Sequence, residues 1–205
     1  MPLLDDEWTD ANFVAGALCL DFSNTLSGRR QSRSKDRLTD TATLLDWFQA
    51  AGLLTPADRR RAGRTVEKQP RWAERRLSEA KTLRECIFNI FDAERLGHHP
   101  DAAALERVNS GIVETAALRK IARIRDGYGW TWDTAADPIG AALGRIAVSA
   151  ADLLASSRRS LVKTCRAENC AWLFVDDTKN RSRVWCDMAV CGNRAKARRY
   201  NHSRR

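Results

Sequence analysis

Four cysteines near the C-terminal end of this 205-residue chain have the residue type and the spacing of a metal site. They form two C-x4-C pairs separated by fifteen residues: Cys165 with Cys170, and Cys186 with Cys191. Each pair can close a small loop over a Zn²⁺ ion, and the segment between the pairs can complete the tetrahedron. Two disulfides are the alternative, but these suit secreted proteins, and the acidic residues 1–7 are unlike a secretion signal. Because four thiolates leave no open coordination position, we expect one structural zinc ion.

The positive charge of the chain is concentrated in the same region. Lys and Arg number 35 and Asp and Glu 26, which gives a net charge of +9. Residues 1–157 contain 22 side chains of each sign, whereas residues 158–205 contain 13 basic and four acidic ones. A balanced body with a basic end is typical of a polyanion binder, and a solvated tail is the alternative. So small and charged a segment buries too little apolar surface to fold alone, and a bound metal would supply the missing stability.

The cysteine-containing segment resembles the CGNR zinc finger, a family named after the tetrapeptide that is Cys191-Gly192-Asn193-Arg194 here. The likeness includes Cys165-Arg-Ala-Glu-Asn-Cys170-Ala-Trp172-Leu-Phe174 and Arg183-Val-Trp185-Cys186, and it spans nearly all of residues 161–205. This resemblance implies that the finger binds DNA.

The preceding part of the chain is similar to the ABATE domain, which commonly comes before this finger. The marker is Gly16-Ala-Leu-Cys-Leu20-Asp21-Phe22-Ser-Asn24-Thr25-Leu26, supported by residues 44–54 and 149–154. Two-part proteins of this kind are regarded as stress-induced transcriptional regulators. The resemblance implies two domains, an ABATE-like helical domain over residues 1–157 and a CGNR-type finger over residues 158–205.

Within the finger, the apolar residues 172–175 predict a strand and residues 183–186 a second one. A helix from residue 188 or 191 to residue 200 would follow, which gives a knuckle, a hairpin and a helix in a treble-clef-like arrangement. Trp172, Phe174 and Trp185 could stack on bases, but we expect them to pack around the metal. Cationic side chains fall on the turn between the strands and on one stripe of the helix. The candidate nucleic-acid contacts are Lys179, Asn180, Arg181, Arg183, Arg194, Lys196, Arg198 and Arg199.

The body is predicted to be mainly helical. Caps and apolar periodicity indicate helices over residues 39–51, 55–68, 71–97, 101–117 and 138–156. The exception is a β-hairpin with a type I′ turn at Asp126-Gly127, which would set Arg125 opposite Tyr128 and Arg123 opposite Trp130. The fold class expected is therefore mainly α, a helical domain with one hairpin plus a small four-cysteine finger.

Other candidate residues of the body have plainer interpretations. Asp21, Asn24 and Thr25 could line a ligand pocket, but they could equally cap a helix or satisfy buried backbone groups. Cys19 and Cys86 stand alone in apolar surroundings, which indicates buried thiols. Because no catalytic triad, phosphate-binding glycine loop or zinc-hydrolase helix is present, we expect no enzymatic activity.

These observations predict a zinc-dependent regulator that binds double-stranded DNA, with the helical domain sensing a signal or dimerising. An RNA-binding or ribosome-associated module and a zinc-stapled protein-interaction domain are the alternatives. No apolar run approaches the length of a membrane span, so we expect a cytoplasmic, nucleoid-associated protein and no membrane partner. The amino-acid sequence does not reveal which DNA sequence is recognised, what the inducing signal is, or what the oligomeric state is. A homodimer is one alternative.

Overall fold

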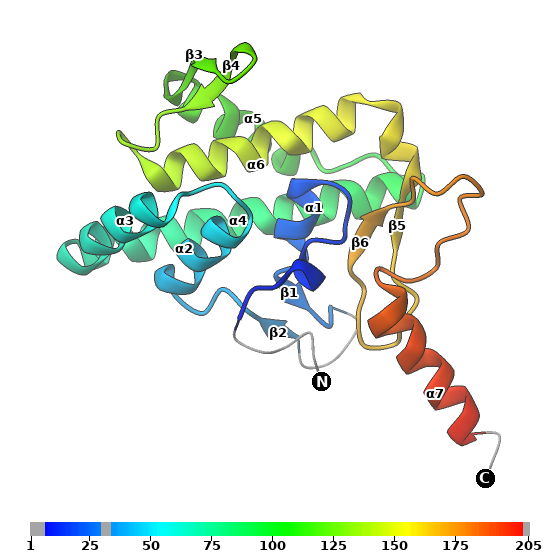
Figure 1. The fold of residues 1–205 in the computed structure, drawn as a ribbon. Helices are drawn as coiled ribbons and strands as arrows, with labels where there is room; N and C mark the ends of the chain where they lie inside the picture. The colour runs from blue at the N-terminus through cyan, green and yellow to red at the C-terminus, as the bar shows by residue number, and fades with distance from the viewer. Residues whose placement is uncertain (1–6, 30–33, 203–205) are drawn as a thin grey trace.

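The computed structural model describes residues 7–29 and 34–202, apart from the side chains of Arg199 and His202. The part of the chain that it describes is mainly helical, as expected, with small antiparallel strand pairs beside the helices (Figure 1). Short 3-10 turns connect several elements: Asp10–Asn12, Ala116–Leu118 and Ser157–Leu161. The helices of the body are α1 (Leu18–Ser23), α2 (Thr41–Ala50), α3 (Pro56–Lys68), α4 (Pro70–Arg95), α5 (Ala102–Thr115) and α6 (Pro138–Ala155).

The core of the body forms around α4 and α6, with the short helix α1 packed against both (Figure 1). In α1, Cys19, Leu20 and Phe22 are fully buried, and Phe22 contacts the ring of Trp47 in α2. α6 is long and apolar enough to cross a membrane, but much of its surface is buried against α1, α4 and α5. It is therefore the central core helix of the body.

The predicted helix starts are confirmed by their caps. The Asp40 side chain accepts a hydrogen bond from the Thr43 N–H at 2.8 Å at the start of α2. Thr55 caps α3 and Asp137 caps α6, each just before a proline at the first helical position, where the missing N–H costs nothing. The predicted ends of α4 and α5 lie two residues too far along the chain.

The predicted hairpin exists, but its register differs from the expectation. β3 (Arg119–Ile124) pairs with β4 (Gly127–Trp132), so the turn residues are Arg125 and Asp126, and Arg123 lies opposite Tyr128. A positive φ of 131° falls on Gly127, after the turn, and neither Arg125 nor Asp126 has a positive φ, so the type I′ turn was wrong. The expected cation–aromatic contact forms with another residue, because the Arg119 guanidinium lies 4.3 Å from the Trp130 ring centroid.

The C-terminal region contains β5 (Val162–Thr164), β6 (Leu173–Val175), a single π-helical turn (Met188–Gly192) and α7 (Asn193–His202). The strand expected at residues 183–186 is not formed; β6 pairs instead with β5, which the sequence did not suggest. A further short pair, β1 (Leu26–Ser27) with β2 (Lys35–Asp36), lies beside the finger in the body.

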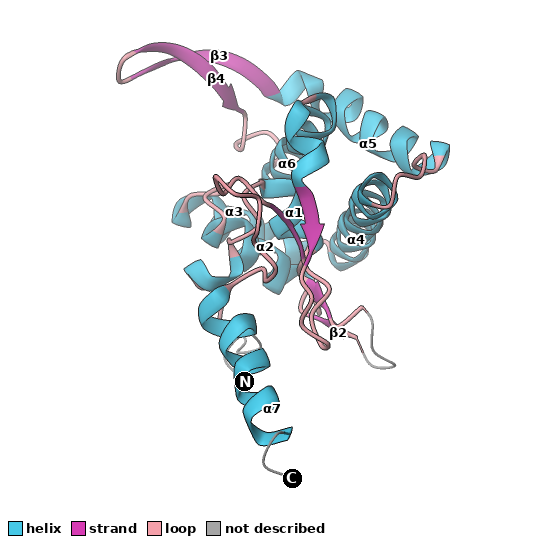
Figure 2. Cartoon of the chain, turned by 90° about the vertical axis from the view of Figure 1, so that its right-hand side faces the viewer, coloured by secondary structure: helices cyan, strands magenta, loops and turns pink. Residues whose placement is uncertain are grey.

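Two elements project from the packed part of the molecule. The β3–β4 hairpin leaves it at one end, and α7 points away at the other, in both views (Figures 1 and 2). α7 therefore offers most of its circumference to a partner.

Candidate metal centre and nucleic-acid interface

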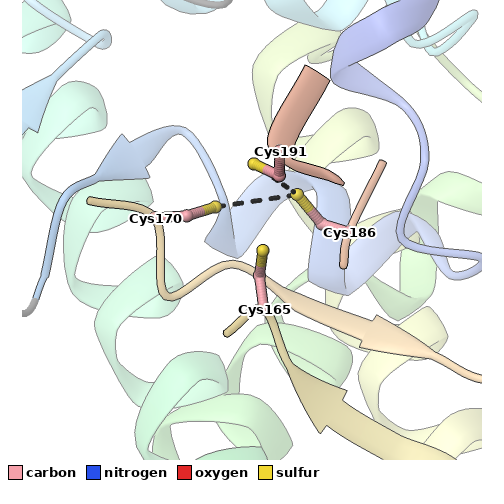
Figure 3. Close-up of side chains that lie close together, drawn as sticks. All are labelled: Cys165, Cys170, Cys186 and Cys191. Carbon is pink, nitrogen blue, oxygen red and sulfur yellow. Dashed lines mark hydrogen bonds between the residues drawn. The ribbon is translucent and has the colours of Figure 1, made fainter. Parts of the chain in front are cut away.

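The four cysteines of the C-terminal region converge on one point, as the spacing predicted (Figure 3). All four are buried, and their Sγ atoms lie within 4.8 Å of one another. The Sγ of Cys186 is 3.6 Å from the Sγ atoms of both Cys170 and Cys191. All four cysteines are free, and the measured distances are well above the S–S bond length of about 2.05 Å.

The sulfur cluster fits zinc. With Zn–S bonds of about 2.3 Å, a tetrahedral site has sulfur–sulfur edges of roughly 3.8 Å, within the spread found here. The four thiols titrate differently when no cation is bound. Hydrogen bonds with Cys170, Cys186 and Cys191 lower the pKa of Cys165, whereas hydrogen bonds with Cys165, Cys170 and Cys191 raise the pKa of Cys186. A divalent cation would stabilise all four thiolates at once. The four cysteines are thus positioned to bind one zinc ion, and because all four positions are filled the site is structural.

The first cysteine pair lies in the loop between β5 and β6. Cys165 follows β5 directly, and its N–H continues the ladder by donating to the carbonyl of Trp172 at 2.8 Å. Between Cys170 and Trp172, Ala171 has a φ of +67°, a left-handed conformation that turns the chain sharply back into β6. The hairpin thereby presents both sulfurs of the knuckle on the same side.

The second pair is held by a loop and the π-helical turn before α7. Asp187 caps this turn by accepting a hydrogen bond from the Val190 N–H at 2.6 Å, which directs Cys191 toward the other sulfurs. Gly192 packs so closely that a Cβ would lie 3.1 Å from Cδ1 of Trp185 and would collide with the sulfur of Met188. The glycine of the tetrapeptide therefore lets Trp185 and the flexible side chain of Met188 pack closely beside the metal centre.

The first half of the finger is attached firmly to the body. One edge of β6 pairs with β5, and its other edge is paired by body residues. The Asn24 side chain accepts from the Leu173 N–H and donates to the Leu173 carbonyl, both at 2.9 Å, and the Val175 N–H donates to the carbonyl of Ala15 at 2.8 Å. The Asn24 amide thus acts as one residue of a neighbouring strand, and β6 has no unpaired edge at Leu173.

The surroundings of Asp21, Asn24 and Thr25 fit the structural interpretation of these residues. All three are buried and hydrogen-bonded within the protein. Asp21 accepts from the Ala15 N–H at 2.9 Å, and the Thr25 hydroxyl donates to the Phe22 carbonyl at 2.8 Å. Burial raises the pKa of Asp21 to about 7, although hydrogen bonds from backbone N–H groups partly oppose this.

Arg183, a predicted nucleic-acid contact, turns inward. Its guanidinium donates to the carbonyls of Val14 (2.9 Å), Trp185 (3.0 Å) and Cys186, and lies 4.4 Å from the Phe174 ring centroid. The sequence shows that this residue is positively charged, but it does not show which way the side chain points. Arg183 therefore joins the body to the zinc centre, and it is not in the set of outward-facing cations.

The loop over residues 177–183 presents the other predicted contacts of this segment. Asp176 is fully buried and accepts hydrogen bonds from Lys163 Nζ at 2.6 Å, the Thr178 hydroxyl at 2.5 Å and the Arg183 N–H at 2.9 Å. Burial alone would raise its pKa, but these bonds lower the pKa to about 2. Fixed at its base by this carboxylate, the loop exposes Lys179, Asn180 and Arg181 to solvent.

The helix α7 presents the remaining predicted contacts. Lys196 and Arg198 are exposed, and Arg194 is partly buried beside the metal centre. Arg198 forms an ion pair with Glu168 of the first knuckle at 2.6 Å. The side chain of Arg199 lies outside the part of the structure that can be described.

Trp172 and Phe174 are buried in a core that body and finger share, whereas Trp185 is partly buried. The first two therefore pack in a core, as expected, but this core includes the helical body as well as the metal centre. The sequence offered no direct signal for the Asn24–Leu173 pairing, because 149 residues separate the partners.

Two family models match the chain. The ABATE model, described as "Putative stress-induced transcription regulator", matches residues 16–157. The CGNR zinc finger model matches residues 162–205. A search of curated proteins found no match.

Proposed function

This chain belongs to the ABATE family and ends in a CGNR zinc finger, and we propose on that premise that it is a zinc-dependent, DNA-binding transcriptional regulator. The observation that carries the proposal is the placement of its charge. The whole excess of positive charge lies in residues 158–205, and the zinc centre holds a basic helix, α7, that projects from the molecule (Figure 2).

In the proposed mechanism, the zinc ion fixes α7 and the loop over residues 177–183 as one rigid surface. Exposed Lys and Arg side chains would neutralise phosphates, and the counterions released would favour binding. Arg guanidinium groups can also pair bidentately with phosphates or with guanine, so the same surface could read sequence. The proposed contacts are Lys179, Asn180, Arg181, Arg194, Lys196, Arg198 and Arg199.

The ABATE domain would transmit the signal. Its rigid attachment to β6 through Asn24 and Ala15 means that a shift in the body would move the finger with it. A homodimer would present two fingers and so raise affinity for DNA. Acting on chromosomal DNA, the protein would be cytoplasmic and nucleoid-associated. Both family descriptions name a regulator or a zinc finger rather than an enzyme.

The test is selection from a random double-stranded DNA pool with the zinc-loaded protein, repeated after chelation. Affinities for the selected duplex, the same sequence as RNA and single strands would then be compared at equal salt. We expect the duplex DNA to bind most tightly and chelation to abolish binding.

Each other outcome supports a different function. Tighter binding to single-stranded RNA would favour the RNA-binding module, with the partly buried Trp185 as a stacking platform. If no nucleic acid binds more tightly than about 10⁻⁵ M at moderate salt, a non-specific level, the basic face serves an acidic protein partner instead.

A further inference from the structure

Two cavities lie on either side of the first knuckle, and together they extend the basic surface well beyond α7. The first, of about 330 Å³, lies between the knuckle and the start of α7 and is lined by Arg166, Arg194 and Arg198, with Trp185 and Glu168. The second, of about 520 Å³, lies between β5, the 181–184 segment and the end of α4.

The second cavity is strongly cationic. Its lining includes Arg95 of α4, Lys163, Arg166, Arg181 and Arg183, and among the described residues no carboxylate lines it. Three of these charges are already engaged, since Arg95 pairs with Asp92, Lys163 with Asp176, and Arg183 with backbone carbonyls. These three side chains are held in place by their partners, and their charges still contribute a positive potential in the second cavity.

Arg166 lines both cavities, so it forms the ridge between them. Its side chain is exposed, and in the described part of the chain neither Arg166 nor Arg181 forms an ion pair. Exposed guanidinium groups that form no ion pair, beside two positively charged cavities, are suited to bind an extended anion that runs along both cavities.

Arg194 gives an independent sign that the first cavity accepts an anion. One terminal nitrogen of its guanidinium is buried and has no hydrogen-bond partner within the described residues. A buried donor left without a partner costs free energy, and a turn of the guanidinium toward the cavity would let a phosphate oxygen satisfy it. The carboxylate lining this cavity, Glu168, is itself paired with Arg198.

We propose that one strand of the DNA backbone follows a continuous path from Arg194 and Arg198, over Arg166, into the groove that ends at Arg95. The body and the finger then contact the same DNA strand. This inference rests on the proposed function and deepens it, because it gives the ABATE domain a direct phosphate contact and places Arg166 at the centre of the interface.

The experiment measures the affinity of the full-length, zinc-loaded protein for a duplex of about 20 base pairs over a range of salt. Arg166→Gln and Arg95→Gln are compared with Arg125→Gln, which removes the same charge from the tip of the distant β3–β4 hairpin. We expect Arg166→Gln to weaken binding about five- to tenfold near 0.1 M salt and to shallow the salt slope by about one unit. Arg95→Gln should weaken binding about two- to fivefold. Zinc content and thermal unfolding confirm that each variant is folded.

The result separates this inference from the proposed function. If Arg166→Gln and Arg95→Gln bind like Arg125→Gln while Arg194→Ala and Arg198→Ala lose affinity, the path is wrong and the DNA-binding function stands. A loss with Arg166→Gln but not with Arg95→Gln also overturns the path, because it confines binding to the finger. If the wild-type protein prefers RNA or binds duplex DNA only at a non-specific level, both the path and the function fail.

Discussion

The two halves of the zinc finger are held in place by different forces. The first half, residues 162–176, contains β5, the first knuckle and β6, and its side chains belong to the core of the body. The second half, residues 177–202, contains the basic loop, the second cysteine pair and α7, which projects into solvent (Figure 1). Ordinary packing and hydrogen bonds hold the first half. In the second half, Arg183 is bonded to the body through the carbonyl of Val14, and beyond Cys186 the metal site is the main link.

The hydrophobic core includes residues of both family matches, and so it continues across residue 157. The zinc ligands are divided between the loop of the β5–β6 pair, which packs into the core of the body, and the segment from Cys186 to Cys191. The metal centre therefore attaches a basic arm to a rigid body, instead of stabilising a self-contained module. Four experiments test this comparison.

The largest effect is expected from removing the metal or one of its ligands. Zinc-binding free energies in finger peptides are about 10–16 kcal/mol, so Cys186→Ser should release residues 186–202. Hydrogen exchange should become fast there, while the Leu173 and Val175 amides, which Asn24 and Ala15 hold, stay protected.

Cys86→Ser is the matched control, because Cys86 lies outside the sulfur cluster. It should keep zinc and normal exchange. If the β6 amides of Cys186→Ser exchange as fast as those of α7, the finger unfolds as one unit and the comparison is wrong.

The second effect is a pH dependence at the junction of body and finger. Because burial raises the pKa of Asp21 to about 7, the folded state holds a proton that the unfolded chain releases near pH 4. The carboxyl group therefore contributes its stability below pH 4 and loses it as the pH rises to 7. The difference from the ordinary value of 3.8 corresponds to roughly 4 kcal/mol at most.

Chemical denaturation between pH 4 and pH 8 would measure this slope. In Asp21→Asn, whose side-chain oxygen can still accept from the Ala15 N–H, the slope should shrink and stability at pH 8 should exceed that of the wild type. An unchanged slope would show that Asp21 ionises freely in the folded protein.

The third effect tests the attachment of β6 directly. Asn24→Ala removes both hydrogen bonds to Leu173 and leaves a buried N–H and a buried carbonyl unpaired, so unfolding should become easier by about 2–3 kcal/mol. Asn89→Ala, on the exposed face of α4, should change stability by less than about 0.5 kcal/mol. Equal effects of the two changes would mean that Asn24 is not a significant link.

The smallest effect is expected for DNA affinity and involves Arg198 in α7. Glu168→Gln removes the ion pair with Arg198 and should raise affinity for duplex DNA about two- to threefold, because the arginine no longer exchanges one anion for another. Glu106→Gln, exposed on α5, is the control for the lost negative charge. Equal gains in the two variants would reduce the effect to net charge.

Much of the fold follows from local signals in the sequence. The caps Asp40 and Thr55 gave the starts of α2 and α3, and the four cysteines gave the metal site, because both depend on residues close together or on one chemistry. The hairpin was found, but its register was wrong, since the Asp126-Gly127 signal did not reveal that the turn begins one residue earlier.

What the sequence could not give is the direction of side chains and the pairing of distant segments. Arg183 looks like any other basic residue of the finger, and only the positions of Val14 and Cys186 show that it turns inward. β5 is three residues long with Lys163 at its centre, too short a pattern to indicate a strand without its partner. Asn24 stood out only as part of the family marker.

The strand-like amide of Asn24 also limits how these parts could be recombined in evolution or in the laboratory. If the finger were fused to another protein, the edge of β6 that Asn24 and Ala15 pair here would be unpaired, and unpaired strand edges promote aggregation. A working chimera would therefore have to inherit the segment from Val14 to Asn24 along with the cysteines.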